Sequence, residues 1–157
     1  TCALPIYIAF SAPYVEIEGT YLVREHSPAQ QVTDLDRDGL RIAVGRGAAY
    51  DLFLSRELRH AAIERAETSA AAITLFDQQH LDAAAGVRQP LAAWAQAHPG
   101  HRVLADRFTA IQQAVAAPAS RPAEALRALF DEVEAIKAGP LLGEAFARAG
   151  QAVTLVR

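Results

Sequence analysis

The stretch LRIAVGRGAAYDLFLSREL, residues 40–58, decides the fold. Its first five residues, with the β-branched Ile42 and Val44, predict a compact strand, and Gly45 and Gly47 mark the turn after it. Apolar residues then recur at helical spacing, at Tyr50, Phe53, Leu54 and Leu58. A strand, a glycine turn and a helix in this order predict the start of a βαβ unit.

The same alternation of strand and helix continues downstream. Strands are expected over residues 61–65, 81–87 and 101–104. Ser69 is the expected N-cap of a helix that runs through residue 76, and Pro90 suits the first turn of a helix that ends near residue 97. This alternation predicts an α/β fold with a largely parallel sheet flanked by helices.

The flanking segments predict further elements. Residues 7–10 form a short apolar run, residues 15–23 read as a strand interrupted by Gly19, and residues 108–115 read as another strand. A loop is expected over residues 118–122. Residues 123–138 predict a strongly amphipathic helix, and residues 141–149 predict a last short one.

Composition excludes several functional classes. The 157 residues are 52% hydrophobic and 21% charged, which is typical of a globular domain with a real core. A net charge of -3 argues against a nucleic-acid binder, because neutralising phosphates needs a basic surface. The longest apolar runs fall well short of the ~20 residues that a membrane helix needs.

Residues 1–6 are expected to be an artefact. They match the translation of a common sequencing-adapter end, ACG TGT GCT CTT CCG ATC. On this interpretation the upstream part of the gene was replaced by adapter, and Cys2 carries no information about the redox compartment. The alternative is an ordinary apolar strand start.

The order of the motifs resembles the family 3 solute-binding proteins of bacterial ABC importers. The hinge motif FS-x-PY of that family is matched by residues 10–14, and the crossing strand by residues 19–23. Ser27-Pro28 with Asp34-Leu35 is similar to the lead-in to the second lobe, and residues 40–47 are similar to its strand and glycine turn. Residues 81–86 resemble the later strand that begins with Asp-Ala.

This resemblance implies the two-lobed fold of the type II periplasmic binding proteins, with one lobe nearly complete and the other partial. Residues 7–24 would be the end of lobe 1 and the hinge strand, and residues 25–104 would be lobe 2. Residues 105–117 would be the return hinge strand, and residues 118–157 the C-terminal helices of lobe 1. The signal peptide and the first-lobe arginine that clamps a substrate carboxylate would belong to a missing N-terminal part.

The same resemblance implies a binding protein rather than an enzyme. The expected function is capture of a small polar or anionic solute in the periplasm by lobe closure, followed by docking to an ABC permease in the inner membrane. We expect a monomer, without cofactor, metal or nucleic acid. Two alternatives stay open: a dehydratase-like enzyme on the same fold, and the ligand-sensing domain of a receptor.

Ligands of open α/β folds bind at the carboxyl ends of parallel strands. The first such end holds Gly47, Ala48 and Ala49, where N–H groups at a helix start would attract an anion. An ordinary glycine turn explains these residues equally well. The family often has a threonine after the glycine, and Ala48 keeps the N–H but lacks that hydroxyl.

The second strand end holds Val87 and Arg88. Amino-acid binders of the family carry an aspartate at the position of Val87, which pairs with the ligand ammonium, and valine cannot do so. Arg88 could instead hold an anionic ligand bidentately, although a solvated surface residue is the simpler interpretation.

The remaining candidates have structural explanations of similar or greater weight. Ser11 and Tyr14 at the hinge could contact the ligand or serve hinge packing. Trp94 is expected in the core, His98 and His101 lack the third partner that a metal needs, and Glu16 with Glu18 is expected to form a solvated face. The candidate ligand-binding residues are therefore Ser11, Tyr14, Gly47, Ala48, Ala49, Val87 and Arg88.

Overall fold

The computed structural model describes residues 7–149 and 153–156 of the chain. Residues 1–6, interpreted as adapter sequence, lie outside the described residues. The chain forms two compact units, which are named here by their content. The core unit is Glu18–Ile111, and the terminal unit combines Thr1–Ile17 with Gln112–Arg157. The predicted second lobe, residues 25–104, falls inside the core unit.

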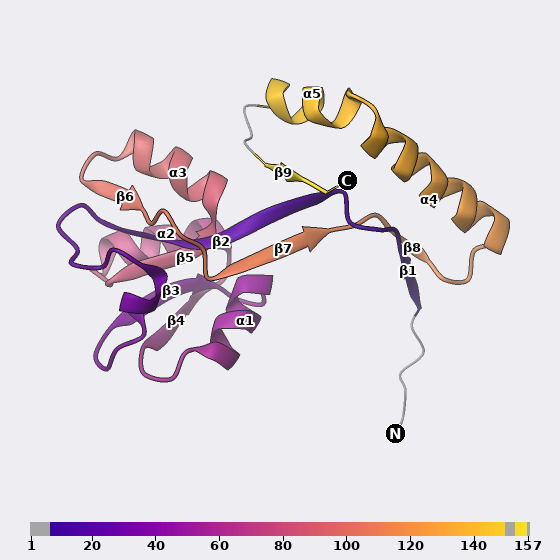
Figure 1. Ribbon diagram of the computed structural model, residues 1–157. Helices are drawn as coiled ribbons and strands as arrows, with labels where there is room; N and C mark the ends of the chain where they lie inside the picture. Colours follow the sequence, from indigo (N-terminus) through magenta and orange to yellow (C-terminus); the bar gives the residue numbers. More distant parts are fainter. Residues whose placement is uncertain (1–6, 150–152, 157) are drawn as a thin grey trace. The chain divides into compact units, whose positions relative to one another are not determined.

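The core unit is built on a mixed sheet with the strand order β4-β3-β5-β2-β6 (Figure 1). Its strands are β2 (Val15–Arg24), β3 (Arg41–Gly45), β4 (Ala62–Ala66), β5 (Ala83–Val87) and β6 (His101–Val103). Strand β3 is parallel to β4 and β5, as the alternation of strands and helices predicts. Strand β2 is antiparallel to β5 and β6, so the crossing strand lies inside the sheet rather than beside it.

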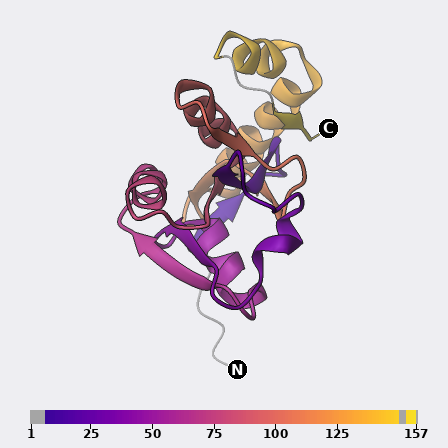
Figure 2. The same ribbon diagram turned by 90° about the vertical axis from the view of Figure 1, so that its left-hand side faces the viewer.

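Helices cover both faces of this sheet (Figures 1 and 2). Side chains alternate between the two faces and build a core on each. Tyr21 and Val23 face the cluster that contains α1 (Ala49–Glu57) and the short helix η1 (Val32–Leu35). Leu22, between them in the sequence, faces α2 (Ser69–Gln78) and α3 (Arg88–Ala97). Because neighbouring strand residues point to opposite faces, the sheet is buried on both sides.

The start of helix α2 differs by one residue from the sequence prediction, whereas the start of α3 agrees with it. Helix α2 is capped by Thr68, whose hydroxyl accepts a hydrogen bond from the Ala71 N–H at 3.0 Å. The predicted cap, Ser69, instead receives a 2.6 Å hydrogen bond from the Tyr50 hydroxyl. Helix α3 begins at Arg88 with Val87 as its N-cap, so Pro90 lies in the first turn of the helix, as predicted.

The terminal unit contains a two-stranded antiparallel sheet of β1 (Ile8–Phe10) and β8 (Ala116–Pro118) and two helices. Helix α4 (Ala123–Ala138) has the predicted bounds, and α5 (Leu141–Arg148) follows it. Strand β7 (Thr109–Gln113) is shorter than predicted, β8 extends to the start of the predicted loop, and β9 (Thr154–Leu155) was not predicted. These short strands lack the length at which periodicity becomes readable.

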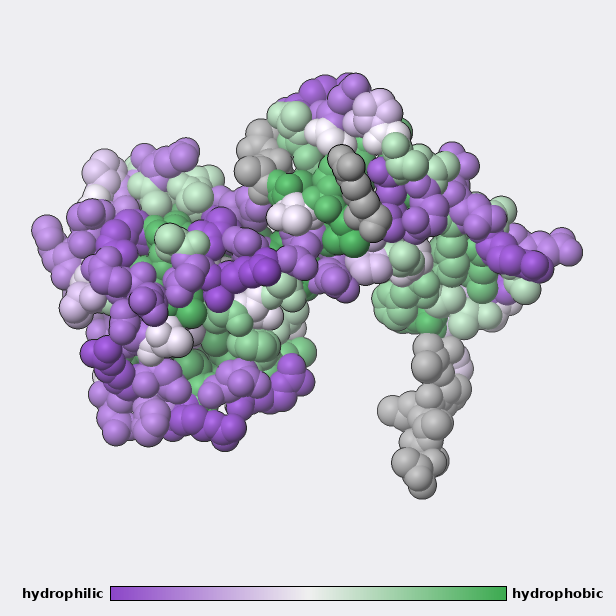
Figure 3. Space-filling model, in the orientation of Figure 1, coloured by the Kyte–Doolittle hydropathy of each residue, from purple (hydrophilic) through white to green (hydrophobic). Residues whose placement is uncertain are grey.

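Burial in the terminal unit is sparse. Val133 is the one buried residue of α4, and α5 buries none. Figure 3 shows hydrophobic residues at the surface over β1 and β8, and Ile8 and Phe10 of β1 are 47% and 61% exposed. Among the described residues, no helix is both long enough and apolar enough to span a bilayer.

Candidate functional site

The carboxyl ends of β3 and β5 lie side by side in the core unit. Ile42 pairs with Ala83 and Ala43 pairs with Ala84 in the parallel register. Since both strands end a few residues later in the same direction, the turn after β3 and the start of α3 meet at one edge of the sheet. The fold therefore brings Gly47, Ala48 and Ala49 to the same edge as Val87 and Arg88.

The turn after β3 uses part of its hydrogen-bonding capacity internally. Gly47 has a φ of +72°, a left-handed conformation that favours glycine. Its N–H donates to Asp51 Oδ2 at 2.8 Å, and the Ala48 N–H donates to the Gly45 carbonyl at 3.2 Å. Helix α1 begins at Ala49, and the first N–H groups of a helix have no acceptor within it. Ala49 is thus the best-placed donor of the three predicted residues.

Asp51 is a residue of this edge that the sequence analysis missed. Its side chain is buried and accepts hydrogen bonds from Gly47 N–H, from Arg65 Nε at 3.0 Å and from Ser55 Oγ at 3.3 Å. Burial disfavours the charged carboxylate, but these donors outweigh it and hold the pKa of Asp51 below its usual value. An aspartate in the first turn of a predicted helix was the available signal.

Val87 contributes an apolar surface at the same edge. It is half-buried and packs against the α1 side of the core, as do Ala48 and Phe108. Val87 lies opposite Gly19 of β2, and a Cβ on Gly19 would lie 2.7 Å from Phe108 Cε2. The Phe108 ring therefore occupies the space that a side chain at position 19 would take.

The sequence analysis considered an anionic ligand or solvent as the surroundings of Arg88. In the structure its guanidinium contacts other residues of the core unit. Its Nε donates to Glu18 Oε2 at 2.5 Å, and its Nη1 donates to the Leu104 carbonyl at 2.8 Å. Its Nη2 donates to the carbonyls of Ala105 and Asp106 at 3.0 and 2.9 Å. Because four of the five guanidinium N–H groups serve these contacts, Arg88 ties the segment after β6 to β2.

Glu18 is not a solvated residue, in contrast to the prediction. Its side chain is 29% exposed and forms ion pairs with Arg88 and with Arg107, whose Nη1 lies 3.4 Å from Glu18 Oε1. The alternation of glutamates along a strand indicates a shared face, but it cannot show which cations the fold brings to that face. The charge of this carboxylate is balanced within the protein.

Ser11 and Tyr14 lie in the terminal unit. The Ser11 side chain is buried, and its hydroxyl donates to the Ala12 carbonyl at 2.7 Å and accepts from the Val115 N–H at 3.0 Å. Tyr14 lines an apolar hollow of about 190 Å³ with residues of α4 and α5 that include Val133 and Leu142. These contacts support the packing interpretation of both residues.

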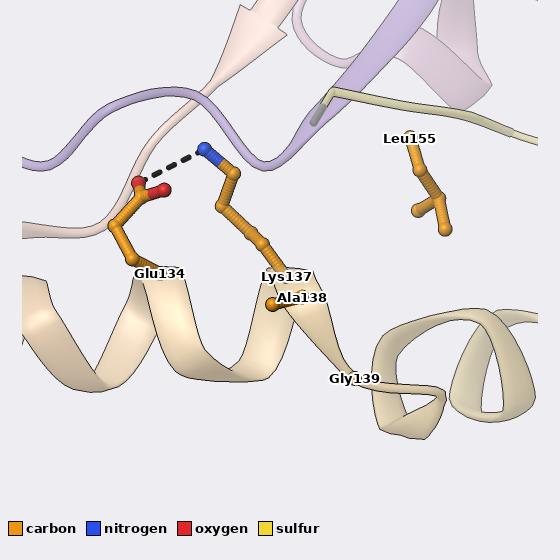
Figure 4. A pocket seen from close by; sticks show the side chains of 5 residues that line it. All are labelled: Glu134, Lys137, Ala138, Gly139 and Leu155. Atoms are coloured by element: carbon orange, nitrogen blue, oxygen red, sulfur yellow. Dashed lines mark hydrogen bonds and ion pairs between the residues drawn. The ribbon is translucent and has the colours of Figure 1, made fainter.

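A larger hollow of the terminal unit, about 340 Å³, contains none of the predicted site residues. Figure 4 shows Lys137 of α4 reaching back to Glu134, with 2.9 Å between Lys137 Nζ and Glu134 Oε1. Leu155, Ala138 and Gly139 complete the lining. The ammonium of Lys137, although largely buried, is therefore neutralised by its own helix.

Comparison with known proteins identifies the fold. No family model and no curated protein sequence matches the chain. The GluR0 ligand-binding core in complex with L-glutamate matches with a TM-score of 0.78 at 19% identity, over 93% of this chain and 67% of that one. A putative ABC-transporter binding component from Wolinella succinogenes, complexed with lysine, gives 0.75 at 19% identity, over 90% and 62%.

A third structure is an ancestral amino acid-binding protein described as a precursor of cyclohexadienyl dehydratase. It gives a TM-score of 0.72 at 21% identity, over 93% of this chain and 64% of that one. The chain thus spans between 62% and 67% of the length of these three structures. Two observations indicate the same fold: the mixed sheet with helices on both faces, and the structural match over nine tenths of the chain. The chain has the α/β fold of the two-lobed periplasmic solute-binding proteins, as its sequence predicts.

Proposed function

We propose that this chain is part of the substrate-binding component of an ABC importer, which captures a small polar or anionic solute in the periplasm. Lobe closure would trap the solute, and the closed form would dock to an inner-membrane permease. The fold shared with a putative ABC-transporter binding component supports this proposal. Adjacent permease and ATPase genes are expected beside the gene, and their consistent absence would count against an importer.

The proposed ligand class rests on the residues that lie at the shared edge of β3 and β5. The start of α1 provides N–H donors beside Ala48 and Ala49, and the neighbouring strand end provides Val87. The nearest carboxylates described above, Glu18 and Asp51, are already paired with arginines. This edge therefore suits a carboxylate or a neutral group and provides no counter-charge for an ammonium.

The cost of binding an ammonium group without a counter-charge is large enough to exclude a class of substrate. A buried charge that loses its partner costs about 3–5 kcal/mol, which corresponds to a loss of affinity of roughly a hundredfold or more. We therefore propose that the solute lacks the α-ammonium group that the amino-acid-binding structures accommodate. Arg88, predicted as a ligand contact, is proposed to act on the site indirectly, by holding Glu18 and the segment after β6.

The enzymatic alternative draws support from the dehydratase precursor among the structural matches. A dehydratase needs a general acid or base close to its substrate. In the described part of the core unit, the shared edge offers Ala48, Val87 and the paired carboxylate of Asp51. Because Asp51 is buried and its pKa is held low, it is poorly suited to proton transfer near neutral pH. We therefore favour binding over catalysis.

A chimera tests the proposed ligand class while supplying a complete first lobe. Residues 18–111 of this chain would replace the matching segment of the Wolinella succinogenes binding component. Titration calorimetry with lysine, standard amino acids, dicarboxylates and aromatic acids should show binding of an acid or neutral solute in preference to any amino acid. Tight binding of an amino acid and none of the acids would contradict the proposal.

Substitution at position 87 sharpens the same test. In the chimera, Val87→Asp should raise amino-acid affinity by roughly a hundredfold, because it restores the ammonium partner. The matched control Val87→Asn has nearly the same shape and no charge, and should leave amino-acid affinity low. Equal effects of both substitutions would show that shape rather than charge governs this position.

A further inference from the structure

The core unit contains a hollow of about 280 Å³ on the α1 side of its sheet, which holds none of the candidate ligand-binding residues. Its lining includes the rings of Tyr21, Phe53 and Phe108 and aliphatic side chains of η1 and α1. The Phe53 and Phe108 rings are nearly parallel, with planes 20° apart and centres 5.9 Å apart, and the Tyr21 ring centre lies 4.7 Å from that of Phe108. Together these rings offer a surface against which a further aromatic ring can pack.

Tyr21 is the most deeply buried polar residue of this hollow. It is 1% exposed, and its hydroxyl forms no hydrogen bond with any residue that the structure describes. Burial, and to a smaller extent the negative charge of Asp36, raise the pKa of Tyr21 well above its usual value, so the hydroxyl keeps its proton. Asp36 also lines the hollow, which places the hydroxyl end of the ring toward this space. A buried donor without an acceptor is unfavourable, and a ligand with an acceptor would satisfy it.

The charged groups around the hollow disfavour an anion. Asp36 accepts hydrogen bonds from the backbone N–H groups of residues 59–61 at 2.8–3.0 Å. Glu57, near the end of α1, is exposed and forms no ion pair with the described residues. The guanidinium of Arg107 is paired with Glu18, with 3.4 Å between Arg107 Nη1 and Glu18 Oε1. The two carboxylates would repel an anionic ligand, whereas a neutral ligand needs no counter-charge.

We propose that this hollow binds a small neutral aromatic molecule whose hydrogen-bond acceptor meets the Tyr21 hydroxyl. The ring of the ligand packs against Phe53 and Phe108. A protein cavity of about 150 Å³ can hold a benzene molecule, so this hollow has room for one ring with a polar substituent. The site is additional to the shared edge of β3 and β5, and this inference is independent of the solute class proposed above.

Benzamide and benzoate are matched probes, because they have nearly the same shape and differ in charge. Titration of the 157-residue chain with benzamide, followed by ¹H–¹⁵N NMR, should shift the amide signals around Phe53 and Phe108. Benzoate should bind at least about tenfold more weakly, since its charge comes close to Asp36 and Glu57, and Glu57→Gln should narrow this difference. Benzamide shifts confined to other parts of the chain, or tighter binding of benzoate, would overturn the proposal.

Two tyrosine variants test the role of the hydroxyl. Tyr21→Phe should weaken benzamide binding about three- to tenfold, because the ligand loses its donor. It should also unfold at the wild-type temperature or above, since the hydroxyl has no partner in the described protein. The matched control Tyr50→Phe removes a hydroxyl of the same core cluster that is bonded to Ser69 outside the hollow, and should retain the affinity for benzamide. Unchanged affinity in Tyr21→Phe, or an equal loss in both variants, would contradict the proposed site.

Discussion

The helices α2 and α4 show how differently the two units bury similar apolar patterns. In α2, Ala72, Ile73 and Phe76 are all buried, because β3 and β5 form a sheet beneath them. In α4, Val133 is buried while Leu129 is 39% exposed. The regular spacing of apolar residues produced a helix in both places. Burial depends on the opposing layer, and only the core unit has an extensive sheet among the described residues.

The largest expected effect comes from deleting a ring in each unit. Phe76→Ala should lower the free energy of unfolding by about 3–5 kcal/mol, because it leaves a cavity in a fully buried cluster. The matched change Phe130→Ala in α4 removes a partly exposed ring and should cost about 1 kcal/mol or less. Urea unfolding followed by far-UV circular dichroism measures both. Similar losses would show that the terminal unit has a core comparable to that of the core unit.

Two glycines provide a second contrast. Gly19→Ala places a Cβ 2.7 Å from both Phe108 Cε2 and Thr109 Cγ2, and should destabilise the core unit by about 1–3 kcal/mol. Gly143→Ala in α5 places a Cβ 3.7 Å from Leu155 Cδ1, an ordinary contact, and should stabilise the helix by about 0.5–1 kcal/mol. The midpoint temperatures of thermal unfolding of the two variants should shift in opposite directions. A neutral Gly19→Ala would mean that the Phe108 ring can shift at little cost.

The smallest expected effect is a change in acid sensitivity. The pKa of Asp51 is held below its usual value, so its contribution to stability is complete above about pH 4 and declines as the pH falls further. Asp51→Asn should therefore reduce the slope of stability against pH below about pH 4, measured by urea unfolding with Trp94 fluorescence. Asp131→Asn in α4, an exposed position, is the control for the same change in net charge. An unchanged slope in Asp51→Asn would contradict the assignment.

Local sequence patterns predicted the helices and strands themselves better than they predicted the position of each element in the fold. The bounds of α4 and the parallel pairing of β3 with β4 and β5 follow from apolar spacing and from alternation of strands and helices. Placement of β2 between β5 and β6 does not, because an antiparallel insertion depends on contacts that are distant in sequence. The cap of α2 was missed by one residue, since Thr68 and Ser69 carry equally suitable hydroxyls.

The sequence predicted which edge of the sheet holds the candidate residues. It did not predict the contacts that their side chains form. Strand ends and glycine turns placed Gly47 and Val87 at one edge of the sheet, which the register of β3 and β5 supports. The environment of Arg88 was not predictable, because its acceptors include carbonyl oxygens of residues 104–106, which any sequence would provide. The role of these residues in ligand binding stays a prediction until the chimera is titrated.

Native-state hydrogen exchange on the 157-residue chain tests most directly the contrast between the two units. The amides of β3 and β5, buried on both faces, should exchange only through global unfolding and be the slowest of the chain. The amides within α4 and α5 should exchange through local opening, at least about a hundredfold faster, because few of their side chains are buried. Equal protection of α4 and β3 would contradict the account, since it would require a core in the terminal unit as complete as that of the core unit.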